Sequence, residues 1–191
     1  TMVEMFARPG FDIHKHAISV LSLGERGWVM VAVFVVSGVL TLLSAYGLFT
    51  AAGPGPKPWG ALLLGLYGTG LILAGIFPAP AGLGFPPGTP AEQQPVMDRA
   101  AIIHSIAFML AFGSLILACL VFAVQFFQAG ASGWAMLSAV AGIAMPVLIG
   151  LGVSSRIPPG IAFYLATVIA WAWFGAVELH LKGYGLGTLA A

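Results

Sequence analysis

The residues of this sequence that could carry chemistry are few, because ionisable side chains are almost absent from its long apolar stretches. His104, Glu178 and His180 lie inside such stretches, and Asp98 and Arg99 stand at the edge of one. An ionisable group in lipid is costly, so its presence indicates either a functional site or a hydrogen-bonded structural contact. His104 and Glu178 are therefore the first candidates for a site.

Three roles are open to His104. Its ring could hydrogen-bond to a neighbouring helix or loop, transfer a proton, or act as an axial ligand to a tetrapyrrole. Haem held between two histidines would need a second histidine at similar depth, and the sequence has none. We favour the structural hydrogen bond and predict no cofactor, with a tetrapyrrole held by His104 alone as the alternative.

Glu178 ends a stripe of residues that helical spacing places on one face. The stripe consists of Tyr164, Thr167, Trp171, Phe174 and Glu178. Such a face could line a site for a hydrophobic ligand, with the carboxylate at its mouth. The alternative is an interfacial ion pair between Glu178 and Lys182, one turn further along the helix.

No pattern in the sequence predicts a catalytic or metal centre. His14 and His16 are two positions apart, so on a helix they would point in different directions and make a poor metal pair. Cys119 is the only cysteine, and Ser154 and Ser155 have no histidine or carboxylate nearby in the sequence. We therefore predict no catalytic residues and no metal site.

The elements that position these residues follow from composition. The chain has 191 residues, of which 60% are hydrophobic and 7% charged. A soluble domain carries about 25% charged residues, so this composition indicates a protein whose solvent is lipid. The formal net charge of +1 gives no electrostatic basis for nucleic-acid binding. The expected partners are the lipid bilayer and other membrane proteins.

Five apolar stretches are close to the roughly 20 residues that a helix needs to cross a bilayer. They span residues 27–50, 59–77, 100–127, 133–153 and 160–181. The sequence therefore predicts an all-α integral membrane bundle, a single domain over residues 1–191 with a short tail at 182–191. A Gly- and Pro-rich turn at 53–58 joins the first two helices, and a proline-rich loop at 78–97 has room to fold outside the membrane.

Residues 1–26 mix charged and apolar side chains. Helical spacing places Asp12, Lys15 and Ser19 largely on one face, opposite an apolar one formed by Phe11, Ile13, Ala17, Val20 and Leu21. This pattern is typical of a short helix that lies in the membrane interface.

Small residues recur at helical spacing in the apolar stretches, and such stripes let membrane helices approach closely. The clearest are in residues 59–77 (Ala61, Gly65, Thr69, Gly68, Gly70, Gly75) and 100–127 (Ala107, Ala111, Ser114, Ala118). We interpret them as ordinary packing, with a ligand cavity or a flexing transport path as the alternative.

A run of motifs along the chain resembles an uncharacterised bacterial membrane family of the domain-of-unknown-function series, number nine-nine-eight. The resemblance covers about residues 8–181, and its most specific block matches at Arg8, Pro9, Gly10, Asp12, Ile18, Ser19, Leu21, Gly24, Gly27 and Trp28. It implies six helices, one of them upstream of this block, and a location in the bacterial inner membrane.

The resemblance and the charges disagree about orientation. The side expected to hold residues 1–26 and the 78–97 loop carries most of the Arg and Lys, which favours a cytoplasmic position. If the implied upstream helix starts in the cytoplasm, the same side faces outward, and we prefer this second orientation.

The chain departs from the family pattern where an aspartate and a histidine are usual, because Pro80 and Ala100 stand there. The resemblance implies that the remaining polar residues gather at one face of the membrane. They are Arg8, Asp12, Ser19, Asp98, Arg99 and His104. A cluster without that acid and base suits the anchoring of a loop better than acid–base catalysis.

Three functions remain open. The first is a non-catalytic accessory, scaffold or assembly subunit of a larger membrane complex. The second is a binder or carrier of a hydrophobic ligand such as a lipid, quinone or pigment. The third, an intramembrane enzyme or transporter, would need more converging polar groups than His104 and Glu178 provide.

Overall fold

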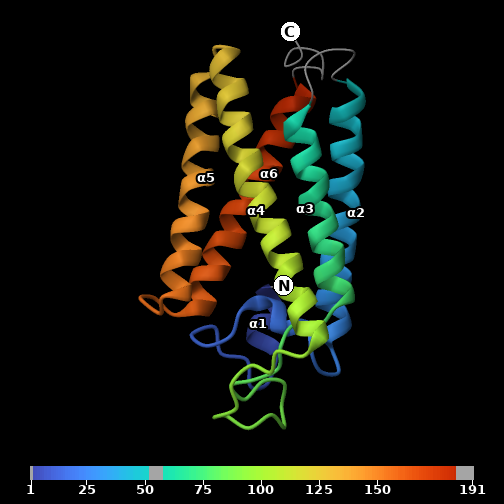
Figure 1. Ribbon diagram of the computed structural model, residues 1–191, viewed down its shortest axis with the longest axis vertical. Helices are drawn as coiled ribbons and strands as arrows, with labels where there is room; N and C mark the ends of the chain where they lie inside the picture. The colour runs from blue at the N-terminus through green and yellow to red at the C-terminus, as the bar shows by residue number, and fades with distance from the viewer. Residues whose placement is uncertain (1, 52–57, 184–191) are drawn as a thin grey trace.

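The structure, a computed structural model, describes residues 2–51 and 58–183 and is helical almost throughout (Figure 1). Two short helical segments precede five long helices. In chain order they are α1 (Met2–Ala7), the 3-10 helix η1 (Ile18–Ser22), α2 (Gly27–Ala51), α3 (Trp59–Ile76), α4 (Arg99–Gln128), α5 (Ser132–Val153) and α6 (Pro159–Gly183).

Within the described residues, five helices are long and apolar enough to cross a membrane, which confirms the predicted all-α membrane bundle. Each begins and ends within two residues of the predicted range, because the apolar stretch and its flanking Gly and Pro set the limits. The helix α6 includes residues 182 and 183, which were predicted to start the tail. The rest of that tail and most of the 53–58 turn lie outside the described residues.

The helices pack in the order of the sequence, α2 on α3, α3 on α4, α4 on α5 and α5 on α6. Glycines mark the closest contacts. A Cβ atom on Gly38 of α2 would lie 2.7 Å from the carbonyl oxygen of Gly68 in α3, and one on Gly70 would lie 2.7 Å from the backbone nitrogen of Ala111 in α4. Small residues thus let these backbones approach, as the packing interpretation predicts.

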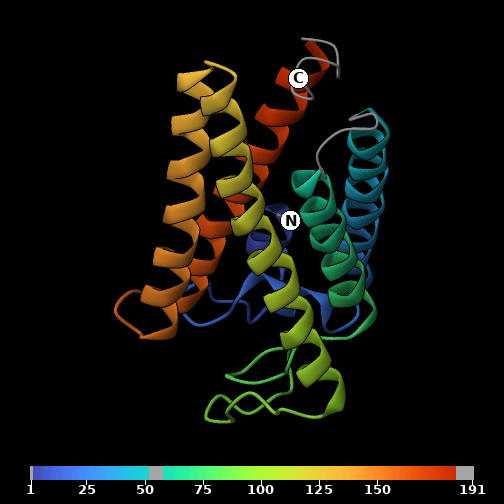
Figure 2. The ribbon, with the colours of Figure 1, turned by 45° about the horizontal axis from the view of Figure 1, so that its top comes forward.

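The ring of helices is incomplete, because α6 packs along α5 but not along α2. Figure 2 shows α6 rising apart from the α2–α3 pair. Between α4 and α6 the core is aromatic, and the rings of Phe122 and Trp173 meet edge to face at 5.8 Å. The indole nitrogen of Trp173 also donates a 3.0 Å hydrogen bond to Ser138 of α5. The opening therefore lies on one side of a bundle that is otherwise closely packed.

One end of the bundle is covered by residues 2–26 together with the loop 77–98, which we call the end cap (Figure 1). The prediction of one amphipathic helix over residues 11–21 is wrong. Residues 8–17 form turns instead, and only the 3-10 helix η1 follows. Gly10, at φ +80°, takes a conformation that no helix contains. The segment also makes specific buried contacts with the loop, which a helix lying in the interface would not make.

The turn before α6 joins the end cap at the same end of the bundle (Figure 1). A Cβ atom on Gly160 would lie 2.0 Å from the carbonyl oxygen of Ile13 and 2.3 Å from that of His16. The N-terminal segment therefore rests directly on the backbone of α6.

Candidate functional site

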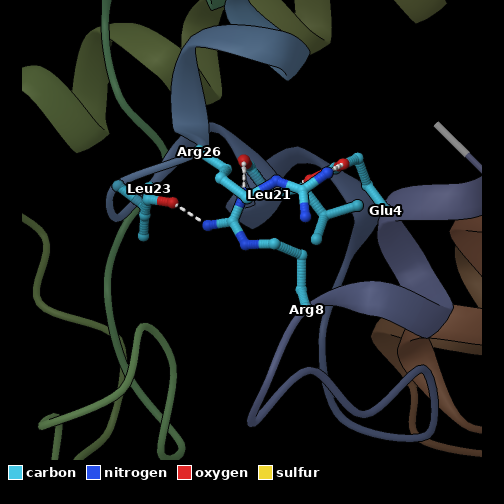
Figure 3. Close-up of polar contacts among 5 residues, drawn as sticks. All are labelled: Glu4, Arg8, Leu21, Leu23 and Arg26. Carbon is cyan, nitrogen blue, oxygen red and sulfur yellow. Dashed lines mark hydrogen bonds and ion pairs between the residues drawn. The ribbon is translucent and has the colours of Figure 1, made fainter.

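Arg8 is the centre of the end cap. Its side chain is 5% exposed and donates hydrogen bonds to the carbonyl oxygens of Leu21, at 3.2 Å, and Leu23 (Figure 3). These carbonyls belong to the end of η1 and the residue after it, where helix carbonyls lack partners in the helix. The planar guanidinium can bond to both at once, so Arg8 fixes the course of the chain between η1 and α2.

A buried carboxylate balances the charge of Arg8. Glu4 of α1 is 6% exposed, and its Oε2 lies 3.5 Å from Nη1 of Arg8. Its other oxygen accepts a hydrogen bond from Arg26, which precedes α2 (Figure 3). Glu4 therefore joins α1 to both arginines, and the three side chains form one charge network.

The loop contributes an aromatic wall to this network. The guanidinium of Arg8 lies 5.5 Å from the ring centroid of Phe85, which is fully buried. Such a cation–π contact adds roughly 0.5–2 kcal/mol in a desolvated setting. Arg8 thus binds the N-terminal segment and the loop together.

Asp12 lies in a separate group with His14, Lys15 and His16. Its Oδ1 accepts a 2.8 Å hydrogen bond from the backbone nitrogen of His14, and its Oδ2 is 4.0 Å from Nζ of Lys15. The backbone nitrogen of Asp12 donates to Nδ1 of His16 at 3.0 Å, and Nε2 of His16 bonds to the carbonyl oxygen of Leu83 in the loop at 3.0 Å.

The other predicted cluster members stand apart from Arg8. Asp98 is exposed and caps α4 by accepting a 2.8 Å hydrogen bond from the backbone nitrogen of Ala101. Arg99 is also exposed, and within the described residues no hydrogen bond or ion pair involves its side chain. Ser19 is half-buried, and its carbonyl oxygen accepts a hydrogen bond from the Ser22 hydroxyl.

His104 is 6% exposed, and its Nδ1 lies 2.8 Å from the carbonyl oxygen of Phe77, the residue that ends α3. The ring also meets Phe34 of α2 edge to face at 6.4 Å. This is the hydrogen bond to a neighbouring element that we favoured for His104, and it ties the start of α4 to the end of α3.

The six predicted polar residues therefore lie at one end of the bundle but form several local groups. Sequence reasoning missed three residues that carry the end cap, Glu4, His16 and Arg26. The i, i+4 spacing of Glu4 and Arg8 could have indicated the first pair. Nothing local indicates that Arg26 reaches Glu4 or that His16 reaches Leu83, because the turns at 8–17 bring these residues together.

The second feature is an apolar groove of about 240 Å³ on the open side of the ring. Its walls are α2, α3 and α6, and its lining residues are Ser37, Leu40, Thr41, Tyr67, Leu71, Trp171, Phe174 and Gly175. Leu40 is 60% and Trp171 41% exposed, so the groove opens to the exterior of the bundle. We call this feature the α2–α6 groove.

The predicted stripe on α6 contributes only part of this lining. Trp171 and Phe174 line the groove, and Phe174 meets Tyr67 of α3 edge to face at 6.4 Å. Tyr164 and Thr167 are half-buried, and Thr167 donates its hydroxyl hydrogen bond to Phe163 within α6. The helical spacing was therefore sufficient to place two of the five residues beside the groove.

Glu178 lies one turn beyond Phe174 and is half-buried. Its carboxylate accepts a hydrogen bond from the hydroxyl of Ser44, across the opening between α6 and α2. The alternative ion pair with Lys182 involves a side chain outside those the structure describes. The Ser44–Glu178 contact places a polar bridge just beyond the apolar lining.

Chemically, the described groups suit contact and anchoring. In residues 2–51 and 58–183, no three His, Cys, Asp or Glu side chains come together as metal ligands would. Arg8, His16 and His104 each hold a backbone carbonyl of another element. The groove offers an apolar surface with a hydroxyl and a carboxylate near one end.

This fold defines a multi-pass helical membrane protein with a structured end cap and an open side. Residues 1–180 match the model of a family described as a protein of unknown function, DUF998, and the chain belongs to that family. No curated protein and no solved structure matches the chain. The family resemblance read from the Arg8–Trp28 block is thereby confirmed.

Proposed function

We propose that the protein is a non-catalytic accessory or scaffold subunit that holds one transmembrane helix of a partner membrane protein in the α2–α6 groove. The observation that carries this proposal is the open side of the ring. Each long helix packs closely on the next one in the sequence, whereas α2 and α6, the first and last of them, leave an exposed apolar groove between them.

The lining supports a helix as the occupant. Ser37, Thr41 and Gly175 are small and stand on facing walls, where they would let another helix backbone approach. A Cβ atom built on Gly175 meets nothing within 4 Å, so the wall is open at this point. The half-buried carboxylate of Glu178 and the hydroxyl of Ser44 could also bond to a polar side chain of the partner.

The use of the polar residues supports a non-catalytic role. Arg8, Glu4, His16 and His104 are each committed to contacts that join elements of the fold. Catalytic acids and bases need to reach a substrate proton, and these groups are instead bonded within the protein. We expect the bacterial inner membrane as the location, as the family resemblance implies.

A groove-filling substitution tests the proposal. Gly175→Phe places a ring in the groove, and Gly113→Phe is the matched control, because Gly113 lies on the outer face of α4 with nothing within 4 Å of its Cβ. We expect a membrane-protein partner to copurify with the unchanged protein in mild detergent. Gly175→Phe should reduce its recovery at least tenfold, and Gly113→Phe should leave it unchanged.

The same preparations test a second candidate function, the binding of a hydrophobic ligand, which the Trp171 and Phe174 lining favours. Native mass spectrometry would then find a small molecule that Gly175→Phe releases, with no protein partner. That result, or equal partner recovery from both glycine variants, would refute the scaffold proposal.

A further inference from the structure

The side chain of His16 is a second link between the two parts of the end cap, beside the contact of Arg8 with Phe85. It is 4% exposed and packs against the rings of Phe11, at 5.7 Å, and Phe85, at 5.6 Å, which also meet each other at 5.9 Å. Both ring nitrogens are bonded, Nδ1 to the backbone nitrogen of Asp12 and Nε2 to the carbonyl oxygen of Leu83, each at 3.0 Å.

These two partners determine where the ring carries its proton. The backbone nitrogen of Asp12 is a donor, so Nδ1 must accept and cannot carry a hydrogen. The carbonyl of Leu83 is an acceptor, so Nε2 must carry one. The closed end cap therefore contains His16 as the neutral Nε2–H form.

We propose that His16 is a pH-sensitive latch that helps to hold the loop 77–98 on the N-terminal segment while its ring is neutral and loosens the part of the loop around Leu83 when the ring takes up a second proton. That proton would go to Nδ1, where it would face the N–H group of Asp12. Protonation thus removes one hydrogen bond and leaves two donors opposed in a buried place.

Charged groups of both signs lie near the latch. On its own segment, the Asp12 carboxylate already accepts from His14 and faces Lys15. The Arg8 guanidinium lies over Phe85, the ring that His16 also contacts, and so adds positive charge nearby.

Of the ionisable groups on the elements packed against the segment, Glu4 bonds to Arg26, Asp98 caps α4 and His104 bonds to Phe77. Glu25 and Arg99 are exposed. The loop before Asp98 contributes Glu92, and the turn before α6 contributes Arg156. Both are exposed, so solvent screens them from the His16 ring.

Spin-label distances test the latch without a readout that is itself sensitive to pH. One nitroxide on Gln94→Cys in the loop and one on Ser132→Cys at the far end of α4–α5 are introduced with Cys119→Ala. We expect a narrow distance distribution at pH 7.5 and a distribution at least twice as broad at pH 5. In His16→Gln, whose amide keeps a donor for Leu83 but does not titrate, the width should change by less than a fifth.

His14→Gln is the matched control, because His14 is exposed and its side chain is not part of the latch. It should retain the full response to pH. The proposal would be overturned if the distance distribution of His16→Gln also broadened at pH 5, or if that of the unchanged protein did not.

Nitrogen-15 NMR of histidine-labelled protein gives a second test that needs no substitution at His16. We expect the His16 signals of the Nε2–H form at pH 7.5, and protonation over the same pH range in which the distances broaden. An Nδ1–H form at pH 7.5 would contradict the latch, whatever happens to the loop. The latch concerns the end cap alone, so it can stand or fail independently of the α2–α6 groove.

Discussion

A single buried arginine holds much of the end cap in place. Arg8 bonds to two carbonyl oxygens, faces a buried carboxylate and covers an aromatic ring. Lysine could supply the charge but not the planar fork that reaches both carbonyls. The residue is therefore specific in shape as well as in charge.

Arg8→Ala should lower the free energy of unfolding by about 3 kcal/mol, because it leaves Glu4 buried with one arginine fewer and leaves the carbonyls of Leu21 and Leu23 without a donor. Titration with SDS followed by circular dichroism measures this change. Arg99→Ala is the control and should change it by no more than about 0.5 kcal/mol. Equal effects of the two substitutions would show that the Arg8 contacts do not stabilise the fold.

For single residues, the sequence indicated where the important polar side chains lie but not which groups they bond to. Scarcity of charge in the apolar stretches singled out His104 and Glu178 as residues that need partners, and the family resemblance added Arg8. Arg8 donates to the backbone carbonyls of Leu21 and Leu23, and His104 bonds to the backbone carbonyl of Phe77. Glu178 accepts from the hydroxyl of Ser44. Backbone acceptors occur at every residue, so sequence alone cannot tell which of them a side chain will reach.

The long helices were the most predictable elements. Their limits follow from the length of apolar sequence needed to cross a bilayer and from the Gly and Pro residues around it. The N-terminal segment was not predictable in the same way. Its apolar and polar residues follow the spacing of an amphipathic helix. The chain forms turns instead, in which Arg8 contacts Phe85 of the loop and His16 bonds to Leu83.

Glycine contacts between helices make a sharp prediction for α3. Gly70→Ala should destabilise the protein by about 1–3 kcal/mol, because its Cβ atom would meet the backbone of α4 at 2.7 Å. Gly65→Ala, on the same helix, is the control, because its Cβ atom would meet only Ala45 at 3.9 Å. Alanine favours helix over glycine by up to about 1 kcal/mol, so Gly65→Ala should be neutral or stabilising.

Unfolding in SDS compares the two variants directly. A Gly70→Ala protein as stable as Gly65→Ala would mean that α3 and α4 can separate at this point without loss. The small-residue stripe would then not set their distance.

For the molecule as a whole, the important property is that the helix ring is open. The sequence predicted the helices and the small-residue stripes but not that α2 and α6 would leave a groove between them. That outcome depends on the summed packing of α3, α4 and α5, which sets the angle of α6 relative to α2. The groove consequently combines Trp171 and Phe174 with Ser37 and Tyr67 from elements far away in the chain.

The most direct test of the proposed function is photo-crosslinking in the native membrane, before any detergent is added. A photoreactive amino acid at Leu40, which lines the groove and is 60% exposed, is compared with one at Leu117, which is 54% exposed on α4. We predict a protein adduct from position 40 and only lipid adducts from position 117. Lipid adducts alone at both positions, or a crosslink from position 40 to an upstream helix of the same chain, would contradict a partner helix in the groove.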